Sequence, residues 1–202
     1  MHQHASSRPK LAIIIGSIRP NRFAEHVARW IEEIAKRRSD FDVALIDLKD
    51  YPMPLFAEEA SPLFALPKDK TARRWQQKVA EFDAYVCTAA EYNHGPAAVL
   101  KNALDYAYAE WNKKPISFVG YGGVGAARAV EQLRLQAIAL QMAPMRTVVN
   151  ILYPAYLAVV QEGKKLSDFD YLNQSAEDML DQLAWWTGAL KTARDQALPE
   201  AA

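Results

Sequence analysis

Apolar runs of strand length recur along the chain, and most of them are apolar at nearly every position. They cover residues 11–16, 43–48, 84–89, 116–121 and 146–152. A strand with one face in water alternates apolar and polar residues, whereas a strand covered on both faces does not. The pattern therefore predicts five strands of a sheet that is buried on both sides.

Between these runs, apolar residues return every three or four positions, which is typical of a helix with one buried stripe. A parallel strand pair needs a crossover, and a helix usually supplies it. The alternation predicts an α/β fold with a parallel sheet and helices on both faces. The stripes are Phe23, Val27, Trp30 and Ile34; Leu100, Ala103, Leu104 and Ala107; Val130, Leu133, Ala137 and Leu140; and Met179, Leu183, Trp186 and Leu190.

The segment 49–67 breaks this alternation. It carries four prolines, so it is neither a regular helix nor an inner strand, and we expect a long ordered loop. Its apolar residues favour either a subunit contact or a lid over the core of the same chain. No repeat or linker divides the sequence, which predicts one domain over 1–202 with frayed ends at 1–8 and 197–202. A covering helix is expected after Gln161.

Composition narrows the function classes. The 24 basic and 24 acidic side chains balance, so no field of one sign attracts nucleic acid or an anionic membrane. No apolar run reaches the roughly 20 residues of a bilayer span, and the first ten residues lack a secretory apolar core. We therefore expect a cytoplasmic protein. The single cysteine, Cys87, gives neither a disulfide framework nor a metal cluster, and its apolar surroundings indicate a buried thiol.

Candidate chemistry first appears in the loop GSIRPNR, which follows the first predicted strand. A glycine lets the chain turn sharply, and the helix that follows offers unpaired N–H groups and a partial positive charge. Ser17, Arg19, Asn21 and Arg22 add donors. The loop has neither the dinucleotide nor the nucleoside-triphosphate glycine signature, so a single phosphate monoester suits it best. The alternative is an ordinary strand-to-helix turn with solvated arginines.

Two further loops follow the third and fourth predicted strands. In EYNHGP, Glu91 to Gly95 form a polar loop before a helix that Pro96 is expected to open, and a planar ring suits Tyr92 and the nearby N–H groups. His94 could act as a base, but no nucleophile stands beside it, so a solvent-facing histidine is the simpler interpretation. In GYGGVG, glycines permit close approach of a ligand.

These three loops belong together if the sheet has the strand order 2-1-3-4-5. In an open parallel sheet, ligands bind outside the carboxyl ends of the strands, and in this order the first, third and fourth strands are neighbours. The loops then form one site at one edge.

The three motifs, GSIRPNRFAEHVARW, EYNHGPAAVLKNALDYAYAEW and SFVGYGGVGAARAVEQLR, resemble the NAD(P)H-dependent FMN reductases, a group that includes quinone and chromate reductases. The resemblance covers about residues 9–155. It implies a flavodoxin-like three-layer sandwich with a five-stranded parallel sheet of order 2-1-3-4-5. It also implies an FMN-dependent oxidoreductase that passes hydride from NADPH or NADH to a small electron acceptor such as a quinone.

The resemblance also implies roles for individual residues. The first loop would hold the FMN phosphate, the second would line the isoalloxazine ring, and the third would approach the flavin from the other side. No catalytic residue and no metal ligand is implied, because the cofactor carries the chemistry. The cofactor-binding residues implied are Ser17, Arg19, Asn21, Arg22 and Phe23; Glu91, Tyr92, Asn93 and His94; and Tyr121, Gly122 and Gly123.

Family members are commonly dimers or tetramers, which makes Trp111, Tyr108 and the 51–64 loop interface candidates in a homodimer or homotetramer. In one place the chain departs from the family, which usually has Thr-Pro where Ala89 and Ala90 stand. This change removes a proline that would stiffen the loop and a hydroxyl that could meet the flavin, so it leaves open whether FMN binds less tightly. The reductase has two alternatives. One is a flavin module for electron transfer or redox sensing with a protein partner. The other is a structural dimer in which the altered loop no longer binds flavin.

Overall fold

The computed structural model describes residues 8–196. The predicted frayed ends at 1–8 and 197–202 lie outside the described residues apart from Arg8, which pairs with Asp42 at 2.9 Å. The strands are β1 (Lys10–Ile15), β2 (Asp42–Asp47), β3 (Ala84–Tyr92), β4 (Gly95–Pro96), β5 (Pro115–Tyr121), β6 (Ala143–Pro144) and β7 (Val149–Ile151). The helices are α1 (Ala24–Arg37), α2 (Lys70–Ala80), α3 (Ala98–Asp105), α4 (Ala127–Ala139), α5 (Tyr153–Gln161) and α6 (Asp170–Gln196), with short 3₁₀ turns at Leu48–Asp50 and Leu166–Asp168.

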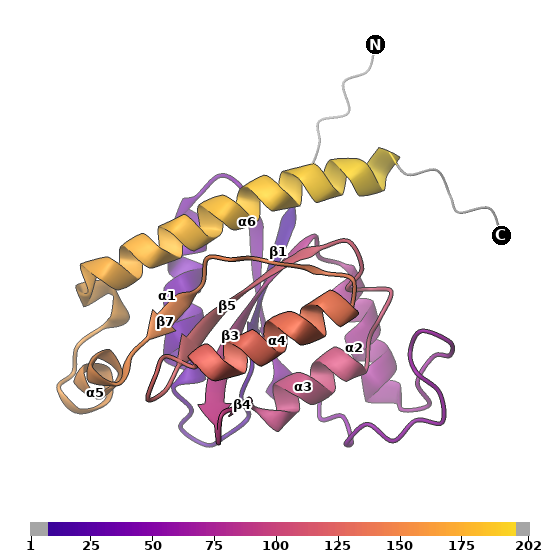
Figure 1. Cartoon of the computed structure of the whole chain (residues 1–202), viewed down its shortest axis with the longest axis horizontal. Coiled ribbons are helices and arrows are strands. Elements are labelled where there is room, and N and C mark those ends of the chain that lie inside the picture. The colour runs from indigo at the N-terminus through magenta and orange to yellow at the C-terminus, as the bar shows by residue number, and fades with distance from the viewer. Residues whose placement is uncertain (1–7, 197–202) are drawn as a thin grey trace, which may run out of the picture.

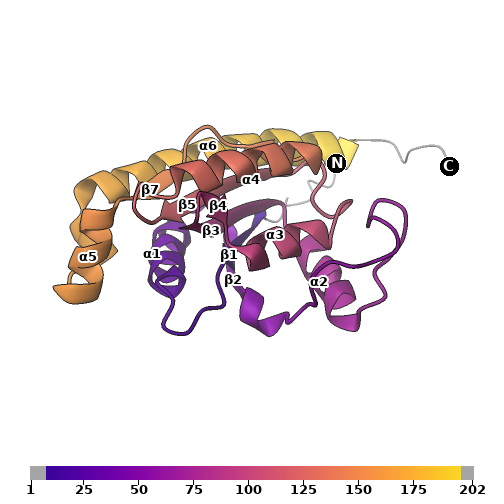
Figure 2. The ribbon, with the colours of Figure 1, turned by 60° about the horizontal axis from the view of Figure 1, so that its bottom comes forward.

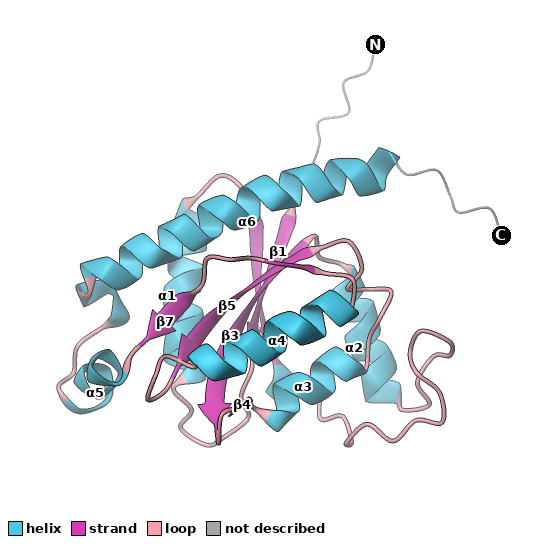
Figure 3. Cartoon of the chain, viewed as in Figure 1, coloured by secondary structure: helices cyan, strands magenta, loops and turns pink. Residues whose placement is uncertain are grey.

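The main sheet is parallel and has the order β2-β1-β3-β5, followed by β6 and β7, which both pair with β5. Figure 3 shows β1, β3, β5 and β7 side by side. β6 and β7 together take the place of the fifth predicted strand. Numbered along the chain, the five strand positions run 2-1-3-4-5, so the predicted flavodoxin-like α/β sandwich is confirmed. The sheet has seven strands in all because β6 and β7 divide the fifth position between them and β4 adds a short antiparallel strand at the end of β3.

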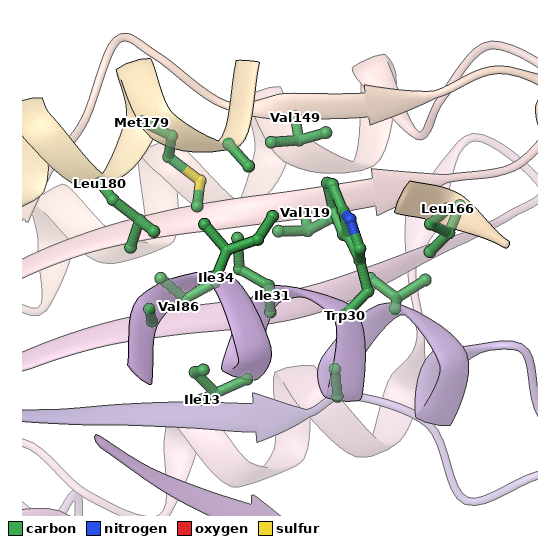
Figure 4. Packing of buried hydrophobic residues seen from close by; sticks show 14 of the residues in the cluster. Ile13, Trp30, Ile31, Ile34, Val86, Val119, Val149, Leu166, Met179 and Leu180 are labelled. Carbon is green, nitrogen blue, oxygen red and sulfur yellow. The ribbon is translucent and has the colours of Figure 1, made fainter. Parts of the chain in front are cut away.

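Helices cover both faces of the sheet. One cluster of buried side chains joins α1 and α6 to the strands, and Figure 4 shows Trp30 and Ile34 of α1 and Met179 of α6 packed over Ile13 and Val119. The second cluster joins α2, α3 and α4 to the opposite face. Figure 1 shows α6 extending along the whole molecule, which agrees with the covering helix expected after Gln161.

Both faces are buried because the strands have almost no polar positions. Five of the six residues of β1 and all seven of β5 are buried, as the continuous apolar runs predict. Cys87, at the centre of β3, is fully buried, and burial raises the pKa of its thiol to about 12. The prediction that Cys87 is buried is therefore confirmed.

Three local expectations need correction. Pro96 does not open a helix; it lies in β4, paired with Glu91, and α3 begins at Ala98. The helices α2 and α5 were not predicted. Trp111 is a poor interface candidate because it is fully buried, with its indole packed on Tyr85 and its Nε1 donating to the carbonyl of Leu104. Tyr108 keeps a partly exposed side chain, whose hydroxyl accepts a hydrogen bond from Gln141 at 2.8 Å.

The proline-rich loop is ordered, as predicted, and it divides its apolar side chains between two environments. Tyr51, Met53 and Phe56 pack against the second core cluster, and the N–H of Phe56 donates to Asn102 at 2.8 Å. Leu55, Phe64 and other side chains point into solvent, with Phe64 80% exposed. Part of the loop is therefore a lid over the core. Within residues 8–196, no helix has both the length and the apolar character that a membrane crossing requires.

Candidate functional site

A pocket of about 280 Å³ opens at the carboxyl ends of β1, β3 and β5. This is the sheet edge where the three loops were expected to meet. Ten of the twelve predicted cofactor-binding residues line it; Asn93 and His94 do not. The lining residues are Ser17, Arg19, Pro20, Asn21, Arg22, Phe23, Ala90, Glu91, Tyr92, Tyr121, Gly122, Gly123, Tyr153 and Tyr156.

The first loop begins at Gly16, where only a glycine fits. A Cβ there would lie 2.1 Å from the carbonyl oxygen of Thr88, while the N–H of Gly16 donates to the Thr88 hydroxyl at 2.9 Å. This close approach ties the end of β1 to β3. Asn21 then takes a left-handed conformation, with φ of 49°, which asparagine adopts more readily than most residues and which reverses the chain into α1.

Arg22 is buried and holds this loop in place through its hydrogen bonds. Its side chain is only 2% exposed, and its guanidinium donates to the carbonyl of Ser17 at 2.5 Å, to Asp47 and to Glu25. Burial opposes the charge on Asp47, but the hydrogen bonds from Arg22 and from the N–H of Lys49 outweigh it and hold the pKa of Asp47 below its usual value. Arg22 therefore joins the first loop to the end of β2.

Arg19 has the opposite surroundings. Its guanidinium lies over the ring of Tyr92, 5.6 Å from the centroid, and it makes no ion pair within residues 8–196. The interaction with Tyr92 raises the pKa of Arg19, so the side chain remains cationic. An exposed cation at the pocket rim without a carboxylate partner is suited to an anionic ligand.

The start of α1 provides further donors beside Arg19. The residue before the helix, Phe23, cannot cap it with a side-chain oxygen, and no side-chain cap is present. The first N–H groups of a helix need partners from outside the helix, and they carry its partial positive charge. With Ser17, which is 2% exposed, these groups make one end of the pocket fit a single phosphate.

The second loop is a tight hairpin. β3 continues through Ala89 and Ala90, which pair with Gly120 and Tyr121 of β5, and it ends at Tyr92. Asn93 and His94 then have positive φ angles of 50° and 70°, typical of a two-residue hairpin turn. The turn carries both side chains away from the pocket.

Glu91 fixes this hairpin to α4. Its carboxylate accepts hydrogen bonds from the Nε of Arg128 at 2.6 Å and from the N–H groups of Arg128 and Ala129 at 3.1 and 3.3 Å. Burial opposes ionisation, yet these bonds keep the pKa of Glu91 below its usual value. The guanidinium of Arg128 also lies 2.9 Å from the Nε2 of His94. Glu91 and His94 thus both contact Arg128, which holds the hairpin against α4.

The third loop closes the opposite side of the pocket. Tyr121 is 8% exposed, and burial raises the pKa of its hydroxyl, which therefore stays neutral. Gly122 has φ of 142°, which strongly favours glycine, and a Cβ on Gly123 would meet nothing within 4 Å. The backbone at Gly122 and Gly123 can accordingly lie close to a flat ligand.

Two aromatic residues of the pocket were missed by the sequence analysis. Tyr153 and Tyr156 lie on the first turn of α5, and their rings stack at 5.9 Å. The ring of Tyr156 also packs edge-on against Phe23 at 4.8 Å. A pair of tyrosines three residues apart, directly after the fifth predicted strand, was the available signal, because that strand ends at the same edge of the sheet.

The assembled pocket combines groups that bind an anion with aromatic rings. Arg19, Ser17 and the start of α1 provide the first, and Tyr92, Tyr121 and Tyr153 provide the second. Across residues 8–196, no group of three or more histidine, cysteine or acidic side chains is arranged to hold a metal ion. This arrangement fits a planar ring system joined to one phosphate.

Comparison with known proteins identifies the family of the chain. The family model for NADPH-dependent FMN reductase matches residues 9–153. An NAD(P)H-dependent FMN reductase of Schizosaccharomyces pombe is 36% identical over 148 residues, which cover 72% of this chain and 74% of that protein. A 2-hydroxy-1,4-benzoquinone reductase of a Burkholderia species is 31% identical over 132 residues, covering 62% and 68%.

A solved structure extends the fold comparison beyond the family match. The flavoenzyme NAD(P)H:(acceptor) oxidoreductase FerB of Paracoccus denitrificans superposes with a TM-score of 0.72 at 20% identity, covering 90% of this chain and 98% of that one. The shared fold therefore covers more of the chain than the family match, which ends at residue 153. On the extent of the family match and the identity to its relatives, the chain belongs to the NADPH-dependent FMN reductase family.

Proposed function

We propose that the pocket binds FMN with its phosphate at the start of α1, and that the enzyme reduces a quinone. Membership of the family makes the chain an oxidoreductase that uses FMN and NAD(P)H. The observation that supports the placement of the phosphate is the contrast between the two arginines. Arg22 is engaged by Asp47 and Glu25, whereas Arg19 is exposed beside the uncapped helix.

In this proposal each loop has one task. Ser17, Arg19, Asn21 and the N–H groups around Phe23 hold the phosphate. Tyr92, Gly122 and Gly123 border the isoalloxazine ring. The N–H groups of the hairpin after β3 would stabilise the negative charge that develops at the edge of that ring. When bound, FMN supplies the redox chemistry, because it accepts hydride from NAD(P)H and passes two electrons to the acceptor.

The hydride transfers need no acid or base on the protein, and the proton that completes the hydroquinone comes from solvent. The nicotinamide and then the acceptor must reach the open face of the ring, so the positions of the aromatic side chains determine access. Tyr153 is 50% exposed and Tyr92 is 38% exposed, both at the pocket mouth. We propose that they are the side chains against which a planar acceptor packs.

The choice of a quinone as acceptor is supported by relatives that carry such names. Besides the Burkholderia protein, a quinone reductase of Pseudomonas putida is 30% identical over 132 residues, covering 60% of this chain and 67% of that protein. The cytoplasmic location, the single domain over 1–202 and the homodimer or homotetramer stay predictions of the sequence analysis.

The test is a spectrum of the purified protein, followed by turnover. FMN should bind tightly enough to give a flavin absorbance that co-elutes with the protein, and NADPH should bleach it. Adding a benzoquinone should restore the colour and sustain NADPH oxidation. Tight FMN binding without turnover on any small acceptor would instead identify an electron-transfer module, and absence of FMN binding would overturn the site.

A further inference from the structure

A second cavity, of about 370 Å³, lies in the groove between α1 and the end of α5. No part of the proposed FMN site uses it. Residues of α1 form one wall, and the segment that leaves α5 forms the other. Its principal lining residues are His26, Arg29, Glu33, Val159, Lys164 and Lys165.

Basic side chains outnumber acidic ones around this groove. His26, Arg29, Lys164 and Lys165 line it with a single carboxylate, that of Glu33. Within residues 8–196, neither Arg29 nor Lys165 makes an ion pair, and the Nζ of Lys164 lies 3.9 Å from Glu162, at the limit of an ion pair. Cations without close partners around a cavity are suited to a ligand with more than one negative charge, such as a phosphate.

The groove lies next to the proposed FMN pocket along the same two helices, with the rings of Phe23 and Tyr156 between the two cavities. Phe23 and Tyr156 line the first pocket, and their rings pack together. One turn further along α1, the ring of His26 stacks on Phe23 at 5.8 Å, and one turn further along α5 lies Val159. A helical turn rises about 5.4 Å, so the two cavities follow each other along the same pair of helices. Figure 2 shows α1 and α5 side by side.

This neighbouring position limits which ligand can reach both cavities. A nicotinamide dinucleotide carries its redox ring at one end and an adenosine at the other, joined by a pyrophosphate. If the ring meets FMN in the first pocket, the adenosine must lie outside that pocket. The basic groove, which begins one helical turn beyond Phe23 and Tyr156, offers the adenosine a position lined by Arg29, Lys164 and Lys165.

Resting on the proposed function, we propose that this groove binds the adenosine end of NADPH and that Arg29, Lys164 and Lys165 contact its 2′-phosphate. NADH lacks this phosphate, so the three cations make the enzyme prefer NADPH. Glu33 would then oppose any more negative ligand and limit the site to one phosphate group.

The experiment removes the three cations together. In the variant Arg29→Ala/Lys164→Ala/Lys165→Ala, the KM for NADPH should rise about tenfold while the KM for NADH changes by less than about twofold. The control is Arg37→Ala, which removes an exposed cation from the last turn of the same helix, outside the groove. It should change neither KM.

A direct binding measurement separates this proposal from the proposed function. Calorimetry with 2′,5′-ADP should show binding to the wild-type protein and about tenfold weaker binding to the triple variant, with 5′-AMP binding weakly to both. An equal KM for NADPH in wild type and triple variant would overturn the proposal, as would equal affinities for 2′,5′-ADP and inorganic phosphate, which indicate a free-anion site. Failure of the proposed function would appear separately, as no flavin binding in the spectral titration.

Discussion

Arg19 and Arg22 lie three residues apart in one loop, and the structure gives them opposite roles. Arg22 is buried among Asp47, Glu25 and the carbonyl of Ser17, while Arg19 lies in solvent over Tyr92. Residue type alone identifies both as cations that suit a phosphate. Only the position of Asp47, which comes from a strand 25 residues away, decides that Arg22 holds the loop together.

At the residue scale we predict that Arg19→Ala weakens FMN binding without unfolding the protein. A charged hydrogen bond to phosphate contributes roughly 1.5 to 3 kcal/mol, so the dissociation constant should rise at least about tenfold. The free energy of unfolding of the protein without FMN should change by less than about 0.5 kcal/mol, as for most surface substitutions. Quenching of flavin fluorescence measures the first quantity, and urea unfolding the second.

The matched variant is Arg22→Ala, which removes the same side chain from the same loop. It leaves Asp47 and Glu25 without their cation and should lower the free energy of unfolding by about 3 kcal/mol. If Arg22→Ala instead left stability unchanged and weakened FMN as much as Arg19→Ala, the division between the two arginines would be wrong.

At the element scale, the site depends on how three loops are held to rigid neighbours. The hairpin after β3 is the clearest case, because Glu91 accepts hydrogen bonds from the first turn of α4 and from the side chain of Arg128. The side chain of Gln132 on the next turn also donates to the carbonyl of His94 at 2.7 Å. Tyr92 therefore sits on a segment that α4 holds in place.

We predict that Arg128→Ala loosens this hairpin and weakens FMN binding about fivefold, although Arg128 does not line the pocket. The backbone hydrogen bonds to Glu91 remain, so the effect should be smaller than that of Arg19→Ala. Hydrogen exchange should show faster exchange at residues 91–95 in the variant, measured without FMN. The conservative variant Arg128→Lys should recover part of both effects.

Unchanged exchange in this hairpin, together with unchanged affinity, would contradict a positioning role. The control is Arg134→Ala, two turns further along α4, where the side chain donates to the carbonyl of Arg146 at 2.6 Å. That substitution should leave the exchange of residues 91–95 as it is in the wild type.

Most elements with a one-sided pattern could be predicted from the sequence. The exception is α2, which was missed although Ala72, Trp75 and Val79 form a buried stripe on it. The strands β1, β3 and β5 and the helices α1 and α6 each have a continuous run or a single stripe. α5, YPAYLAVVQ, carries no charged residue and therefore shows no polar face to set against an apolar one. The hairpin at Asn93 and His94 was missed for a different reason, since Pro96 fits a helix start as well as a short strand.

At the scale of the whole molecule, the proline-rich loop 49–67 indicates where a second copy would bind. It is held by hydrogen bonds between Asn102 and the backbone at Pro54 and Phe56, both at 2.8 Å. Yet Leu55, Phe64 and Leu66 are 78%, 80% and 71% exposed on it. An ordered loop that displays large apolar side chains is typical of an interaction surface. Since Trp111 is buried, this loop is the stronger interface candidate.

We therefore predict that Phe64→Asp/Leu66→Asp dissociates the proposed homo-oligomer. Burying two such side chains contributes about 1.5 to 3 kcal/mol each, so placing charges there should raise the dissociation constant of the oligomer by a factor on the order of 100 or more. Sedimentation velocity over a range of concentrations measures this shift. Trp185→Asp is the control, because Trp185 is 68% exposed on α6, far from the loop along the chain. A double variant that sediments like the wild type, with a Trp185 variant that becomes monomeric, would move the interface from the proline-rich loop to the long C-terminal helix.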